Sequence, residues 1–141
     1  MLLNIAIACL LFVGTTVIHA AGMTLAFRSM QSRDRDPRKQ TKLSRIVRIS
    51  SIVILMFLAS VVEVLLWAVV YLGLGAIDGL ERAFYFSMVT FTTLGYGDVV
   101  LPVNWQLLSS FEAANGIIMF GWTTSIVIAV VGRTYFKDKD E

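Results

Sequence analysis

The sequence is poor in the residues that build reactive sites. Its 141 residues include one histidine, one cysteine and two prolines, and only 16% of its side chains are charged. A lone cysteine, Cys9, excludes a disulfide within the chain and any zinc site built from cysteines. His19 is the single histidine, and no nucleophile–base pair or cluster of metal ligands is visible. We therefore expect neither an enzyme nor a resident cofactor, and no nucleic-acid partner.

What the sequence has instead is apolar length. Hydrophobic residues make up 57% of the chain and its mean hydropathy is +0.75, far above that of a soluble domain. Three stretches, residues 2–27, 49–74 and 107–135, are longer than the roughly 20 residues that cross a bilayer. A fourth, residues 80–93, is too short to span and suits a re-entrant segment. The sequence thus predicts an all-α membrane protein with three transmembrane helices and one re-entrant helix.

The first of these stretches has an alternative interpretation as a cleaved signal peptide. It lacks a basic start, and its apolar run is too long for a signal peptide. We therefore expect residues 1–28 to form an additional N-terminal transmembrane helix, whose role the sequence leaves open.

Basic residues are distributed unevenly around the apolar stretches. Of the 12 lysines and arginines, only Arg82 lies between the second and third stretches, and the others lie in residues 28–48 or near the C-terminus. Because basic residues favour cytoplasmic loops, we expect residues 29–48 and the tail, residues 136–141, to be cytoplasmic. The N-terminus would then lie outside a plasma membrane or bacterial inner membrane.

The basic loop over residues 29–48 permits two interpretations. Asp36 and Pro37 form a pattern typical of a helix start. Leu43, Ile46 and Val47 would then share one helix face, which favours a short interfacial helix in contact with anionic lipid. Alternatively, the basic residues only fix the topology.

The most unusual segment is TTLGYGD, residues 92–98. Residues 78–81, DGLE, resemble a capping box and predict a helix over residues 79–92 with the aspartate as its cap. The C-terminus of such a helix carries a partial negative charge that favours a cation. Gly95 and Gly97 follow, and glycine adopts positive φ readily. Alternating φ turns successive carbonyl groups to one side. If several copies of the chain surrounded an axis, these carbonyl oxygens would replace the hydration shell of an ion.

This segment resembles the selectivity filter of potassium channels. The surroundings are similar too, with an outer helix (49–74), a pore helix (79–92), a filter (93–98) and an inner helix (107–135) forming a pore domain over residues 49–135. The resemblance implies a homotetramer that conducts K+ between backbone carbonyls. The filter residues it implies are Thr93, Leu94, Gly95, Tyr96 and Gly97, of which the first four carry the ion-binding carbonyls and Thr93 adds its hydroxyl.

The same resemblance implies residues that support the filter. Tyr96 would pack behind it against Tyr85 and Phe86, and Asp98 would lie at its outer mouth. Thr92, at the other end of the motif, would also support the filter. Val89 stands where some family members carry a glutamate bonded to the aspartate, so we expect Tyr85 to donate to Asp98 instead. Another departure is Leu94, which is not β-branched and leaves the filter backbone less stiff.

The inner stretch contains two glycines. By resemblance, Gly116 either permits the helix to bend or allows close helix packing, and we assign Gly121 to packing. The cavity and gate would be lined by residues at one-turn spacing, which are Phe120, Thr124 and Ile128.

Polar residues inside membrane spans need partners. For Glu63 the candidate partners are Ser87, Thr90 and Trp122. We expect no direct pair with His19, which lies nearer the cytoplasmic end, and we interpret His19 as a donor between helices. Glu112 and Asn115 are predicted to brace the pore helix, and bracing is favoured over gating for Glu63 as well.

These observations predict a passive potassium channel subunit. A weakly selective cation channel is the alternative if the leucine and the missing carboxyl pair loosen the filter. A non-conducting subunit that regulates other channel chains is the alternative from another class. The spans contain no series of arginines, so no voltage sensor of the usual kind is expected.

Overall fold

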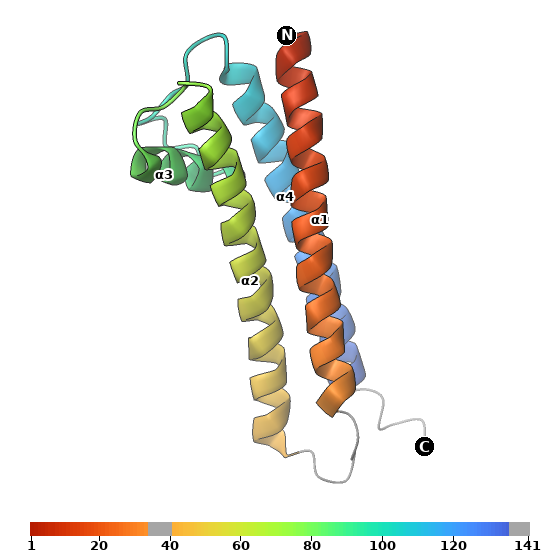
Figure 1. The fold of residues 1–141 in the computed structure, drawn as a ribbon. Coiled ribbons are helices and arrows are strands. Elements are labelled where there is room, and N and C mark those ends of the chain that lie inside the picture. Colours follow the sequence, from red (N-terminus) through yellow and green to blue (C-terminus); the bar gives the residue numbers. More distant parts are fainter. Residues whose placement is uncertain (34–40, 136–141) are drawn as a thin grey trace.

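Four helices make up the part of the chain that the structure describes. The computed structural model describes residues 1–33 and 41–135, except for the side chains of residues 29–33, 133 and 135. α1 (Leu2–Arg33), α2 (Lys42–Gly73) and α4 (Gln106–Tyr135) form a long bundle, and α3 (Leu80–Phe91) lies across one end of it (Figure 1). The described ranges contain no strand, which confirms the predicted all-α fold.

The three long helices match the three predicted spans. They contain 32, 32 and 30 residues, and all three are long and apolar enough to cross a membrane. At 1.5 Å per residue each is about 45 Å long or more, which exceeds the roughly 30 Å of a bilayer's hydrocarbon core. α3 has 12 residues and is about 18 Å long, so its length suits a re-entrant helix.

α2 begins earlier than the apolar stretch does. Thr41 is its N-cap, and the Thr41 side chain accepts a hydrogen bond of 3.2 Å from the backbone N–H of Ser44. The basic residues 42–48 are therefore the first turns of α2 and form no separate interfacial helix. The predicted helix start at Asp36 and Pro37 lies outside the described residues.

The start of α3 corrects the predicted cap. Gly79, with φ +84°, is the N-cap residue, and no side chain caps the helix. The capping-box prediction for Asp78 was wrong because Gly79 supplies the turn into the helix, which leaves Asp78 one position too early to reach the free N–H groups.

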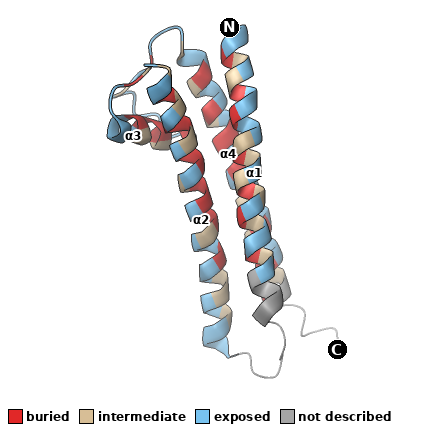
Figure 2. Cartoon of the chain, viewed as in Figure 1, coloured by how far each residue is buried: buried red, intermediate tan, exposed pale blue. Residues whose placement is uncertain are grey.

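The faces that pack against one another carry small and polar residues. On α1 the buried positions recur every three or four residues, and they are Asn4, Ala8, Leu11, Thr15, His19, Gly22 and Ala26. Figure 2 shows the buried positions on the sides that face neighbouring helices. Small residues let membrane helices approach closely. A Cβ added at Gly14 would lie 3.0 Å from Leu66, and one at Gly22 would lie 3.2 Å from Ala59.

Candidate functional site

The loop after α3 has an alternating backbone. Thr93, Gly95 and Gly97 have φ of +60°, +57° and +76°, and Thr93 is the one non-glycine residue with positive φ in the described ranges. Leu94 and Tyr96 between them have no positive φ. The alternation that the two glycines predicted therefore begins one step earlier, at a threonine. A left-handed threonine is strained, and such strain concentrates at functional sites.

The loop's backbone donors are tied to the end of α3. The N–H of Thr93 bonds to the carbonyl of Thr90 at 2.9 Å. Those of Leu94 and Gly95 both bond to the carbonyl of Val89, at 3.0 and 3.2 Å. These bonds hold the first half of the loop directly beneath the helix C-terminus, where the helix dipole is negative.

The loop's carbonyl groups have no such partners. Among the described residues, no hydrogen bond to the carbonyl oxygens of residues 93–97 is formed within the chain. Backbone carbonyls away from water need a partner. A run of unpartnered carbonyls on an alternating backbone is suited to binding a cation.

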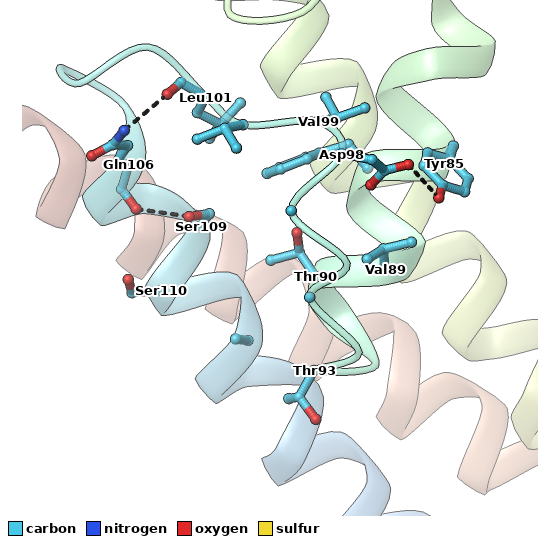
Figure 3. A pocket seen from close by; sticks show the side chains of 15 residues that line it. Tyr85, Val89, Thr90, Thr93, Asp98, Val99, Leu101, Gln106, Ser109 and Ser110 are labelled. Atoms are coloured by element: carbon cyan, nitrogen blue, oxygen red, sulfur yellow. Dashed lines mark hydrogen bonds between the residues drawn. The ribbon is translucent and has the colours of Figure 1, made fainter.

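The outer end of the loop is held by a tyrosine. Tyr85 Oη donates a hydrogen bond of 2.7 Å to Asp98, as the sequence predicted (Figure 3). This hydrogen bond raises the pKa of Tyr85, so the phenol stays protonated at neutral pH and the bond persists. Val89 points between α3 and the loop and makes no polar contact there (Figure 3).

A cavity of about 350 Å³ separates the loop and α3 from the start of α4. Its polar lining comes from both sides and includes Thr90 and Thr93 on one side and Ser109 and Ser110 of α4 on the other (Figure 3).

Tyr96 departs from its predicted position. It is 67% exposed and is not packed behind the loop. Phe86 instead lies 5.3 Å, centroid to centroid, from Tyr71 of α2 in an edge-to-face arrangement. In the single chain α2 lies against Phe86 whereas Tyr85 is exposed, so the packing of Tyr96 against these two residues in an assembled channel stays a prediction. Leu94 is likewise exposed.

Glu112 braces α3 as predicted. Glu112 Oε2 accepts a hydrogen bond of 2.7 Å from Tyr71 of α2, and Glu112 Oε1 contacts Ser87 Oγ of α3. Asn115, which was predicted to share this task, instead exchanges hydrogen bonds of 2.9 and 3.2 Å with Thr15 of α1. The prediction for Asn115 was wrong because it placed no helix against that side of α4.

Glu63 and His19 form the direct pair that we did not expect. His19 Nδ1 lies 2.8 Å from Glu63 Oε1, and both side chains are fully buried. None of the predicted partners bonds to Glu63. The prediction assumed that the first two apolar stretches end at the same depth. They are offset by about one and a half turns, since Gly22 lies against Ala59.

His19 is a link between helices, which confirms its predicted role. Its Nε2 lies 3.3 Å from Thr123 Oγ1 of α4, and its ring lies 5.7 Å from that of Trp122. α1, the helix of His19, is also held at its start, where Asn4 donates a hydrogen bond of 2.8 Å to the carbonyl of Asn104. The sequence analysis missed the roles of Asn4 and Thr15, although the regular spacing of polar residues along α1 was a signal for them.

The glycines of α4 differ in their surroundings. A Cβ at Gly116 would lie 1.9 Å from the carbonyl oxygen of Phe91, the last residue of α3. Of the two interpretations of Gly116, the structure therefore favours close packing. A Cβ at Gly121 would meet nothing within 4 Å, so the packing assigned to Gly121 is absent from the described chain.

The predicted cavity residues lie on one side of α4. Phe120, Thr124 and Ile128 are all exposed in the single chain, which leaves this face free. Phe120 also contacts Phe91 edge to face, with centroids 5.8 Å apart, so the face begins at the end of α3.

A family model described as "Ion channel" matches residues 51–133, more than half of the chain. The chain belongs to this ion channel family. The match includes most of α2, the whole of α3 with the loop, and most of α4, so the geometry above is that of an ion channel subunit embedded in a membrane. α1 lies outside the matched range. No curated protein and no solved structure matches the channel chain.

Proposed function

We propose that the channel is a homotetrameric, passive conductor selective for K+. One observation carries the proposal: unpartnered carbonyls follow one another along a loop of alternating φ, at the C-terminal end of a short helix. Carbonyl oxygens in that arrangement replace the hydration shell of K+. The carbonyls of Thr93, Leu94, Gly95 and Tyr96 and the Thr93 hydroxyl would be the ligands.

Fourfold assembly is supported by what a single chain leaves exposed. One loop supplies one wall of a binding site, and four copies around an axis would complete it. Leu94 and Tyr96 are exposed in one chain and would be covered by neighbouring copies. The exposed face of Phe120, Thr124 and Ile128 would line the cavity below the loop.

The orientation follows from the positions of the charges and helix ends. Asn4 bonds to Asn104, so the N-terminus lies at the same end of the bundle as the residues that follow the loop. The basic residues at the start of α2 lie at the other end (Figure 1). By the positive-inside rule, the N-terminus and the loop's outer mouth would face outside and the C-terminus the cytoplasm of a plasma or bacterial inner membrane. Residues 28–48 would there meet anionic lipid.

The test is the reversal potential of purified protein in planar bilayers, with potassium on one side and sodium on the other. A reversal close to the potassium equilibrium value is expected. Gly95→Ala should abolish the selective current because Gly95 has φ +57°, which strains any residue with a Cβ. Gly73→Ala is the matched control, since a Cβ there meets nothing within 4 Å and the residue has no positive φ.

Other results point elsewhere. A robust current that reverses near zero would indicate a weakly selective cation channel, as the leucine at position 94 allows. A purified protein that forms no tetramer and carries no current would favour a regulatory subunit instead.

A further inference from the structure

Three helices meet at the carboxyl group of Glu112. Glu112 lies on α4 and is fully buried. Tyr71 Oη of α2 lies 2.7 Å from Glu112 Oε2, and Ser87 Oγ of α3 is in contact with Glu112 Oε1. Ser87 Oγ also lies 2.9 Å from the carbonyl oxygen of Val64 on α2. Every oxygen in this cluster thus lies within hydrogen-bond distance of a polar neighbour.

The number of protons available constrains how the cluster is bonded. A serine hydroxyl has one proton, and a backbone carbonyl can only accept. If Ser87 donates to Val64, then Glu112 must carry the proton of the Glu112–Ser87 hydrogen bond. Tyr71 then donates to the other carboxyl oxygen, and all of these contacts are hydrogen bonds at once. With an ionised Glu112, Ser87 would donate to the carboxylate and its contact with the Val64 carbonyl would lack a proton.

The surroundings also favour the neutral form. Both carboxyl oxygens face hydroxyl groups, Oε2 that of Tyr71 and Oε1 that of Ser87. The basic residue of α3, Arg82, is exposed near the start of that helix. A fully buried carboxylate without a cation beside it is costly, and a neutral acid avoids that cost.

We propose that Glu112 is a neutral carboxylic acid that donates to Ser87 and so fixes the position of α3 under the filter loop. The proposal rests on the proposed function, because it assigns a positioning residue to that same loop. Ser87 lies about one turn before the end of α3, on its buried face. One turn further along α4, Gly116 lies against the carbonyl of Phe91. α4 therefore holds α3 at two levels, one by hydrogen bonding and one by close packing.

Three variants separate a neutral donor from other roles. Glu112→Gln keeps the geometry, since the amide N–H can donate to Ser87 while the amide oxygen accepts from Tyr71. Glu112→Ala leaves the buried Tyr71 hydroxyl without its partner, which is destabilising. Ser87→Ala is a small change that removes the hydroxyl's contacts with Glu112 and with the Val64 carbonyl, and it serves if Glu112→Ala does not assemble. Each is measured as potassium current per reconstituted tetramer and as the potassium-to-sodium permeability ratio.

We expect Glu112→Gln to retain the wild-type current and permeability ratio within about twofold, and Glu112→Ala to lose about tenfold or more. Ser87→Ala should weaken both quantities, and Ser87→Ala combined with Glu112→Gln should be no worse than Ser87→Ala alone. The infrared spectrum of wild type should also contain the carbonyl stretch of a protonated acid that is absent from Glu112→Gln.

The proposal is overturned if that infrared band is missing, if Glu112→Gln fails as Glu112→Ala does, or if Ser87→Ala matches wild type in current and permeability ratio. The infrared measurement needs no current. A wild-type protein without a potassium-selective current would therefore refute the proposed function, while the infrared band would still decide the protonation of Glu112.

Discussion

The contact between Gly116 and the end of α3 allows a sharp prediction for Gly116→Ala. The new Cβ would lie 1.9 Å from the carbonyl oxygen and 2.8 Å from the carbonyl carbon of Phe91. Ordinary contact begins near 3.4 Å, so α3 and α4 would have to separate by about 1.5 Å at this point. The obstacle is backbone, which cannot rotate away as a flexible side chain can. The loop of residues 93–97 starts two residues later, so the displacement would be passed directly to Thr93.

The expected cost can be estimated from two opposing effects. Overpacking of a well-packed site costs about 1–3 kcal/mol, and a backbone obstacle places this site at the upper end of that range. Alanine in place of glycine stabilises a helix by about 1 kcal/mol, which opposes this cost. The net loss of about 2 kcal/mol corresponds to a roughly thirtyfold fall in the equilibrium constant between correctly placed and displaced α3.

The assay is potassium efflux from proteoliposomes loaded with equal amounts of tetramer, with selectivity measured against sodium. Gly116→Ala should reduce the efflux by more than tenfold and lower the selectivity, whereas Gly121→Ala should affect selectivity far less because it meets nothing within 4 Å in its own chain. If Gly116→Ala instead keeps the wild-type selectivity and changes only the fraction of time that the pore is open, Gly116 acts as a hinge and the packing argument is refuted.

Two further predictions concern buried and exposed hydrogen bonds. His19→Leu should destabilise the protein in detergent by about 3 kcal/mol because Glu63 loses its buried partner. The double variant His19→Leu with Glu63→Leu should recover at least half of that loss. Thermal unfolding measures both variants, and additive losses would contradict the pairing. Tyr85→Phe removes the hydrogen bond to Asp98 and should speed the decay of current during sustained opening. Because that bond raises the pKa of Tyr85, the stabilisation that it gives the loop is fully present below pH about 10 and is lost as pH rises past the folded-state pKa. The current of wild type should therefore decay faster at alkaline pH, and that of Tyr85→Phe should not.

The fold was predictable because membranes restrict the choices available to a chain. Apolar length alone gave three spans and a helix too short to span, since helices satisfy their own backbone in lipid. The loop followed from its glycines, because positive φ is a local property that the sequence displays directly. The Tyr85–Asp98 bond was implied by the resemblance to potassium channels, and it is local, since the two residues lie 13 positions apart.

Contacts between distant helices were not predictable in the same way. The His19–Glu63 pair depends on the vertical offset of α1 against α2, and hydropathy gives the length of a span but not its depth relative to a neighbour. The partner of Asn115 depends on which side of α4 is covered by α1. Tyr96 is exposed in the single chain, and its predicted contacts belong to an assembled channel.

The central claim is that the carbonyls of residues 93–96 bind the permeant ion. The most direct measurement is the anomalous scattering of rubidium, a substitute for potassium, in crystals of the assembled channel. The account predicts rubidium peaks stacked along a fourfold axis between the carbonyl oxygens of these residues, and their loss in Gly95→Ala. An assembled tetramer that conducts, yet shows no rubidium on its axis beside these carbonyls, would contradict the claim.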